Sequence, residues 1–72
     1  MNAQRTAQQI LDQTNELARE LYRIRGYSVS PGYRFDSATH PHEKEAWNGA
    51  CAALLILTYT DIEDVLEELA DE

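Results

Sequence analysis

The chain has 72 residues and a formal net charge of -7 at pH 7, because 13 acidic side chains face 6 basic ones. This length allows one domain, and a single core of that size rarely supplies more than about 3–5 kcal/mol without a further constraint. Cys51 is the only cysteine, so an intramolecular disulfide and a cysteine zinc site are excluded. We therefore expect two copies of the chain to pair as a homodimer.

The sequence shows no sign of secretion or membrane insertion. Residues 1–10 lack the apolar region of a signal peptide. The longest nearly apolar stretch, Ala50 to Leu57, is far shorter than the roughly 20 residues that span a bilayer. We expect a soluble protein in the cytoplasm, either of the producing cell or of a host that it enters.

A helix is predicted over residues 3–25. Its apolar positions are separated by alternating steps of four and three residues, as in a coiled-coil seam. The seam consists of Ala3, Ala7, Ile10, Thr14, Leu17, Leu21 and Ile24, widened by Leu11 and Ala18. Gly26, which follows Arg23 and Arg25, predicts the end of the helix near Arg25.

An extended, aromatic strap is predicted over residues 26–39. Around Ser30-Pro31-Gly32, smaller or polar residues alternate with Tyr27, Val29, Tyr33 and Phe35. Proline followed by glycine favours a type II turn, which does not match the twist of a hairpin. We expect the strap to fold over the helices, with a short hairpin as the alternative.

A second helix is predicted over residues 40–58, with Pro41 in its first turn. From Ala46 to Leu57 it is apolar on almost every side, which is typical of a helix that is buried all round. We expect it at the centre, in contact with both other helices and with a second copy of the chain. The expected core and dimer seam consist of Ile10, Leu17, Leu21, Ile24, Trp47, Leu54 and Leu57.

A third helix is predicted over residues 61–70, opened by a capping box at Thr60-Asp61-Ile62-Glu63. Residues 61–72 contain seven carboxylates and no base, so their charge equals the net charge of the chain. One helical face is nevertheless apolar, with Ile62, Val65, Leu66 and Leu69. The whole chain is thus expected to be a single all-α domain, 1–72, of three helices with a strap between the first two.

Two interpretations of the acidic helix stay open. In the first, its carboxylates only solvate the exterior. In the second, they imitate a phosphate backbone and occupy a basic nucleic-acid groove on another protein. Two features favour the second interpretation, in which the helix binds a partner. There is no base over twelve residues, and some of the acids oppose the helix dipole. The candidate partner-binding residues are Asp61, Glu63, Asp64, Glu67, Glu68 and Asp71.

The strap supplies a second candidate surface. Tyr33 and Phe35 lie among arginines, a composition found in protein-binding hot spots. Packing of the same rings on the helices is the simpler interpretation. A grip on single-stranded nucleic acid is a third, which the acidity of the chain disfavours.

No metal or catalytic site is expected. His40 and His42 flank Pro41 at a helix start, so they do not converge easily on one ion. Cys51 lies among alanines and leucines, where a thiol is usually inert. Without a nucleophile paired to histidine or a glycine-rich phosphate loop, we expect no enzyme activity and no cofactor. We also expect no direct binding of nucleic acid or membrane.

The residues from Arg25 to Leu69, about two-thirds of the chain, resemble small accessory proteins of tailed phages and prophages. The shared features are the aromatic strap, the His-Pro-x-Glu helix start with Trp47, and the Thr-Asp start of an acidic tail. The resemblance implies a context in which many small acidic proteins block host nucleic-acid enzymes, defence nucleases among them. It assigns no functional residue.

We therefore expect a phage-encoded, protein-binding inhibitor, a DNA mimic or anti-CRISPR-like protein. It would present its acidic helix to a host enzyme or defence complex with a basic surface. The alternative is a structural or regulatory adaptor that binds through Tyr33 and Phe35 while the acidic face is only solvated.

Overall fold

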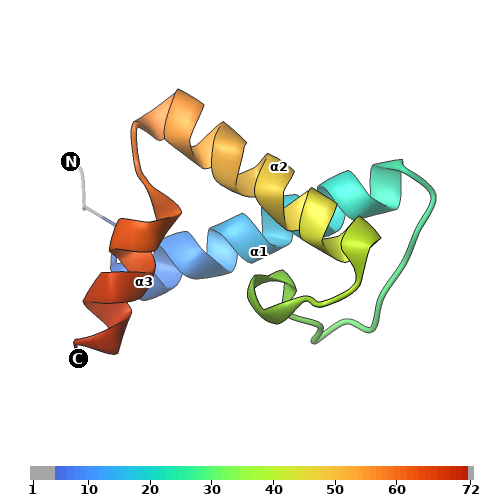
Figure 1. Cartoon of the computed structure of the whole chain (residues 1–72), viewed down its shortest axis with the longest axis horizontal. Helices are drawn as coiled ribbons and strands as arrows, with labels where there is room; N and C mark the ends of the chain where they lie inside the picture. The colour runs from blue at the N-terminus through green and yellow to red at the C-terminus, as the bar shows by residue number, and fades with distance from the viewer. Residues whose placement is uncertain (1–4, 72) are drawn as a thin grey trace.

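The computed structural model describes residues 5–71, and these form three α-helices and no strand. α1 spans Ala7–Ile24, α2 spans Pro41–Thr58 and α3 spans Ile62–Ala70, with a short 3-10 helix, η1, over Phe35–Ser37. The predicted all-α architecture is confirmed, and the hairpin alternative is wrong. α2 crosses α1, and α3 packs at the N-terminal end of α1 (Figure 1). None of these helices has the length and apolar character needed to cross a membrane.

A capping box sets the start of α1. The Thr6 hydroxyl accepts a hydrogen bond from the Gln9 N–H at 3.1 Å, and the Gln9 side chain accepts one from the Thr6 N–H at 2.8 Å. α1 therefore begins at Ala7, not at residue 3 as the apolar spacing predicts. The expected seam residue Ala3 lies outside the described residues.

A Schellman motif ends α1 where the sequence predicts it. Gly26 has a φ of 93°, and its N–H donates to the Arg23 carbonyl at 2.9 Å. The Tyr27 N–H donates to the Tyr22 carbonyl at 3.2 Å, and the two tyrosine rings stack with centroids 4.8 Å apart. This contact turns the chain sharply into the connecting segment, residues 26–40.

The other helix starts also use side-chain caps. His40 is the N-cap of α2, where its Nδ1 accepts from the His42 N–H at 3.2 Å. The predicted capping box at Thr60 is wrong by one residue. Asp61 is the N-cap of α3 and accepts from the Glu63 N–H at 2.9 Å. A carboxylate at this position also complements the positive end of the helix dipole.

The turn between α2 and α3 is closed by a residue in an unusual conformation. Tyr59 has φ 56° and ψ 32°, in the left-handed region, and its N–H donates to the Leu55 carbonyl at 2.8 Å. Glycine usually fills this position, and a residue with a Cβ costs roughly 1–2 kcal/mol there. The Tyr59 side chain is 89% exposed, so no internal contact offsets this cost.

The main core lies where α1 crosses α2. Ala18 and Ala50 are completely buried, so the two helices approach closely at this point. Phe35 of η1 is only 1% exposed and packs edge-on against Tyr22, with centroids 5.4 Å apart. A smaller cluster joins Val65 of α3 to the first turns of α1.

Asn15, a buried polar residue of α1, ties the connecting segment to this core. Its amide nitrogen donates to the Leu11 carbonyl at 3.1 Å and to the Asp36 carboxylate at 2.9 Å. Its oxygen accepts from the backbone N–H groups of Phe35 and Asp36. Because all of its hydrogen-bonding capacity is used, Asn15 is buried at little cost and holds η1 in place.

The turn in the connecting segment differs in type from the predicted one. Tyr33 N–H donates to the Ser30 carbonyl at 3.0 Å, which closes a turn over Pro31 and Gly32. Gly32 does not have the positive φ that a type II turn requires, so this turn is not of type II.

The buried face of α1 is rotated from the predicted seam. Leu11 and Ala18 lie at its centre, whereas Leu17 is partly exposed and Ile24 is 67% exposed. The reason is that Asn15 and Tyr22 also face inward, toward the connecting segment.

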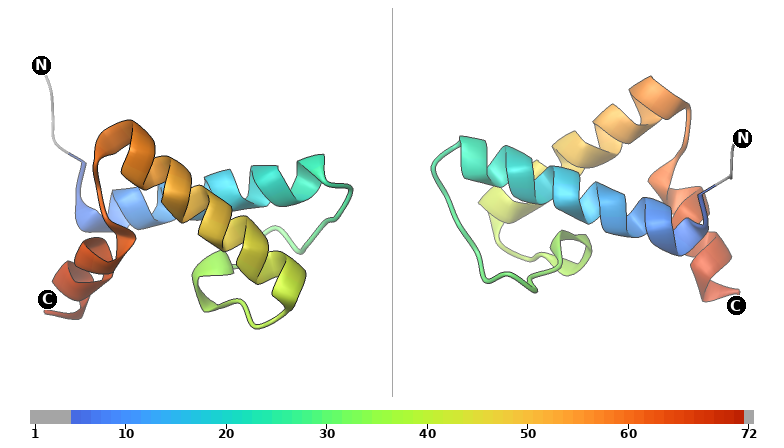
Figure 2. Two further views of the ribbon diagram at one scale, coloured as in Figure 1. Left: turned by 45° about the horizontal axis from the view of Figure 1, so that its top comes forward. Right: turned by 180° about the vertical axis from the view of Figure 1, so that it is seen from behind.

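α2 is not buried all round in the single chain. Ile56 is 70% exposed and Leu57 is 77% exposed, although Leu54 is buried as expected. α2 crosses α1 at an angle, so its last turns rise away from α1 before residues 59–61 lead back to α3 (Figure 2).

Replacing Asn15 by alanine should lower the free energy of unfolding by about 2–4 kcal/mol, because two backbone N–H groups lose their acceptor in the core. Urea unfolding followed by circular dichroism measures this. Gln13→Ala, at an exposed position of the same helix, should change stability by less than about 0.5 kcal/mol. Equal stability of both variants would show that the Asn15 bonds do not anchor the segment.

Candidate functional site

The acidic face of α3 is the most distinctive surface of the protein. Val65 is buried against α1, and Ile62 and Leu69 pack beside it, so these residues fix which side of α3 faces inward. At about 100° per residue, the carboxylates fall on the remaining side. They are all exposed: Glu63, Asp64, Glu67, Glu68 and Asp71.

The acids outside α3 are all used inside the molecule. Four arginines form ion pairs with five of them, namely Asp12, Glu16, Glu20, Asp36 and Glu45. The sixth, Glu43, accepts a hydrogen bond from the Tyr33 hydroxyl. In contrast, no ion pair among residues 5–71 involves a carboxylate of α3.

The net charge is therefore concentrated at one end of the fold. Residues 61–72 hold 7 of the 13 acids, so the remaining 6 acids balance the 6 bases of residues 1–60. Asp61, Glu63 and Asp64 stand at the positive end of the α3 dipole, whereas Glu67, Glu68 and Asp71 stand near its negative end. The second group is unfavourable for the helix by a few tenths of a kcal/mol each. A surface optimised only for stability would not contain it.

Of the two aromatic candidates, Phe35 is inaccessible. It lies in the main core, so the structure corrects its assignment as a partner-binding residue. Tyr33 is half-buried, with its ring edge-on to Phe35 at 5.1 Å between centroids. The hydrogen bond to Glu43, together with loss of solvent, raises the pKa of the Tyr33 hydroxyl to about 12. Tyr33 thus joins the connecting segment to α2.

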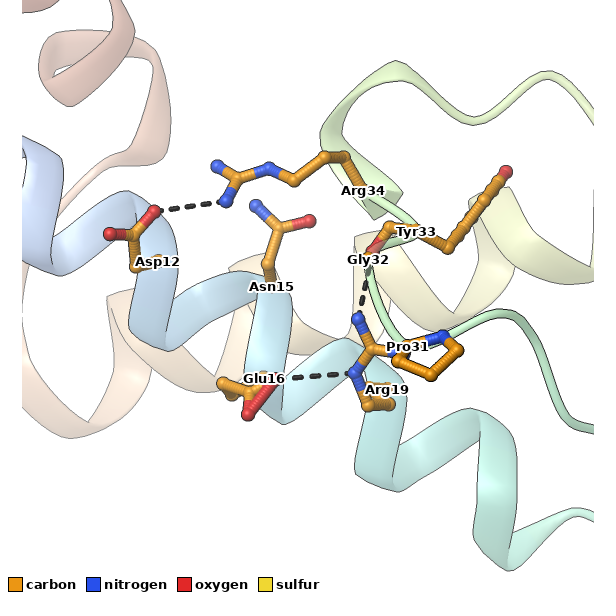
Figure 3. Close-up of a pocket in the computed structure, with 8 residues that line it drawn as sticks. All are labelled: Asp12, Asn15, Glu16, Arg19, Pro31, Gly32, Tyr33 and Arg34. Atoms are coloured by element: carbon orange, nitrogen blue, oxygen red, sulfur yellow. Dashed lines mark hydrogen bonds and ion pairs between the residues drawn. The ribbon is translucent and has the colours of Figure 1, made fainter.

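A pocket of about 200 Å³ lies between α1 and the connecting segment (Figure 3). Its walls carry two acids and two arginines, together with Asn15, Pro31, Gly32 and Tyr33. Arg34 binds Asp12 at 3.0 Å, and this hydrogen bond lowers the pKa of the Asp12 carboxyl. Arg19 donates to the Ser30 and Tyr33 carbonyls at 3.1 and 2.8 Å. Each charged group of the pocket walls already has a partner inside the molecule. These hydrogen bonds and ion pairs hold the connecting segment against α1.

The two histidines and the cysteine lie in structural positions of the described chain. No group of three or more potential metal ligands occurs within residues 5–71. His40 serves as a helix cap, and its ring lies against that of His42 at 5.2 Å between centroids. Loss of solvent, and then the nearby Asp61 carboxylate, raise the pKa of the Cys51 thiol to about 11. The thiolate is therefore scarce at neutral pH.

Two residues with structural importance have only faint signals in the sequence. Asn15 is a polar residue within the apolar stripe of α1, and Tyr59 stands where a helix usually ends in glycine. Neither pattern predicts the hydrogen bonds or the backbone conformation that the structure contains.

Comparisons with protein-family models, with curated proteins and with solved structures found no match.

Alkylation of Cys51 by iodoacetamide should be slow at pH 8 and should accelerate about tenfold per pH unit toward pH 11, because only the thiolate reacts. Native protein should react about a hundredfold more slowly than urea-unfolded protein at pH 8, since the pKa of Cys51 rises from 9.0 to about 11 on folding. Mass spectrometry of timed samples gives both rates. Equal rates would refute a protected thiol.

Proposed function

We propose that this protein is a non-enzymatic inhibitor that presents α3 to the basic nucleic-acid-binding surface of another protein. In keeping with the phage-like resemblance, the proposed partner is a host enzyme or defence complex. The proposal also includes pairing of two chains, which leaves both acidic faces outward. The observation that carries it is the separation of charge: α3 holds five exposed carboxylates without a basic partner in residues 5–71, while the rest of the chain is balanced.

The spacing of these carboxylates is compatible with imitation of a nucleic-acid strand. From Glu63 to Asp71 the helix advances about 12 Å at about 1.5 Å per residue, so five charges are about 3 Å apart along the axis. A strand of B-DNA carries one phosphate per roughly 3.4 Å. Over the same length, a strand of B-DNA carries about four or five phosphates, so the five charges of the α3 face have a similar linear density.

The surroundings of α3 also support recognition by a basic surface. Its apolar side is anchored on α1, so a partner meets charges on a folded helix and not on a loose tail. A rigid array of charges attracts an oppositely charged groove over several ångströms and accelerates association.

The adaptor alternative has less support. It places binding on Tyr33 and Phe35, but Phe35 is buried and the Tyr33 hydroxyl is bound to Glu43. Only part of the Tyr33 ring is left for a partner.

The quadruple variant Glu63→Gln, Asp64→Asn, Glu67→Gln, Glu68→Gln should fold normally, because these side chains are exposed and make no ion pair in residues 5–71. It should no longer compete with duplex DNA for purified bacterial nucleic-acid-binding enzymes. Competition by the wild-type chain should weaken as salt rises. Fluorescence anisotropy of labelled DNA measures the displacement.

A matched control removes the same amount of charge from the other side of the molecule. Its four substitutions, also from -7 to -3, are Asp12→Asn, Glu16→Gln, Glu20→Gln and Glu45→Gln. These acids are paired, so the control should still compete with DNA if the charges of α3 are what the partner recognises. Equal competition by the α3 variant and the wild type would eliminate charge recognition by α3.

A further inference from the structure

One face of α2 remains exposed after the chain has folded. It contains Gly49, Ala52 and Ile56, and it is followed three residues later by Tyr59, the C-cap just beyond the helix; all four are exposed. We propose that this stripe, the α2 seam, pairs with the same stripe of a second copy in an antiparallel, two-fold arrangement. This proposal rests on the proposed pairing of two chains, but it does not depend on which partner α3 binds.

The seam is self-complementary when one copy is reversed. Its first half is small, with Gly49 and Ala52, and its second half is large, with Ile56 and Tyr59. Steps of three, four and three residues are symmetric, so reversal places Tyr59 opposite Gly49 and Ile56 opposite Ala52 at the same time. A two-fold axis requires this reciprocity, because each contact must occur twice.

Leu21 of α1 lies close beside Gly49, so a large side chain from a partner would meet Leu21 at this point. The Leu21 Cδ1 atom lies 3.3 Å from where a Cβ at position 49 would be. Leu17 and Ile24 lie on the same face of α1 as Leu21, three or four residues away, and both are exposed. The partner's aromatic ring would therefore rest on a glycine with aliphatic side chains beside it.

The conformation of Tyr59 supports the same interface. A left-handed backbone and an 89% exposed ring are both unfavourable for an isolated chain. Strained residues of this kind concentrate at functional contacts. Tyrosine is also among the residues enriched at the centres of protein interfaces.

Charge selects a second copy as the occupant. No charged residue occurs from Ala46 to Thr60, although the chain as a whole has a net charge of -7. Two such chains repel each other at α3 and can meet only through a neutral surface. An interface of standard size buries about 800 Å² per chain, and the exposed apolar residues Leu55, Leu17 and Ile24 flank the seam and would enlarge the contact.

Sedimentation equilibrium of the full chain tests the seam. The wild type should be a dimer at micromolar concentration, and Ile56→Asp should raise its dissociation constant by about a hundredfold or more. Leu57→Asp is the matched control, because Leu57 is similarly exposed but lies on the side of α2 that continues the buried face of Ala50 and Leu54. It should leave the dimer intact.

A second variant separates folding from pairing. Tyr59→Gly suits the left-handed position, so the single chain should fold at least as well, while the dimer should weaken by about tenfold or more. If the dimer survives both Ile56→Asp and Tyr59→Gly, the α2 seam is not the interface. The same conclusion follows if Leu57→Asp weakens the dimer as much as these variants do. If the wild type is a monomer, the two chains do not pair at all. The α3 quadruple variant should stay dimeric, so failure of charge recognition is seen separately.

Discussion

The fold depends on one buried amide, that of Asn15. The connecting segment has no regular structure apart from η1, and a chain of 72 residues has little apolar surface with which to hold it. Asn15 supplies four hydrogen bonds from the middle of α1, and these bring Phe35 under the crossing of α1 and α2. Without the ring of Phe35, the close contact of Ala18 with Ala50 would leave a void beneath it. Phe35 is thus buried because the hydrogen bonds of Asn15 hold its backbone in the core.

The same segment accounts for the distribution of charge. Arg19 and Arg34 bind backbone carbonyls and acids around the connecting segment, and Arg23 and Arg25 pair with Glu20 and Glu45. Such exposed pairs contribute little individually, but together they occupy the arginines of the described chain that lie beyond the first turn of α1. None of these four arginines pairs with a carboxylate of α3 within residues 5–71. The acidic face is therefore a consequence of where the basic residues are used, as well as of where the acids are placed.

Much of the fold can be predicted from sequence, because it depends on local signals. The end of α1 and the start of α2 follow from Gly26 and Pro41, and the start of α3 is predicted to within one residue, because these signals act over a few residues. The rotation of α1 cannot be predicted in this way. The spacing of Ile10, Leu17, Leu21 and Ile24 describes an apolar stripe, but which edge of it is covered depends on the connecting segment and on Asn15.

In the candidate site, too, features set by local sequence can be predicted, and features set by distant residues cannot. The acidic face follows directly from helical periodicity, because Val65 and its neighbours determine the inward side of α3. Phe35 cannot be assigned from sequence, since an aromatic residue between two helices suits a core and an interface equally well. Its burial depends on a partner, Asn15, that lies twenty residues earlier in the chain.

Two exposed surfaces of opposite character remain after the chain has folded, and salt affects them in opposite ways. The α2 seam is neutral and apolar, so pairing through it gains from screening of the repulsion between two chains of net charge -7. Contact between α3 and a basic groove loses from the same screening. In the proposed pair, two chains joined at α2 would present two acidic helices, and a partner with two basic grooves would bind them with a gain from multivalency that a single chain lacks.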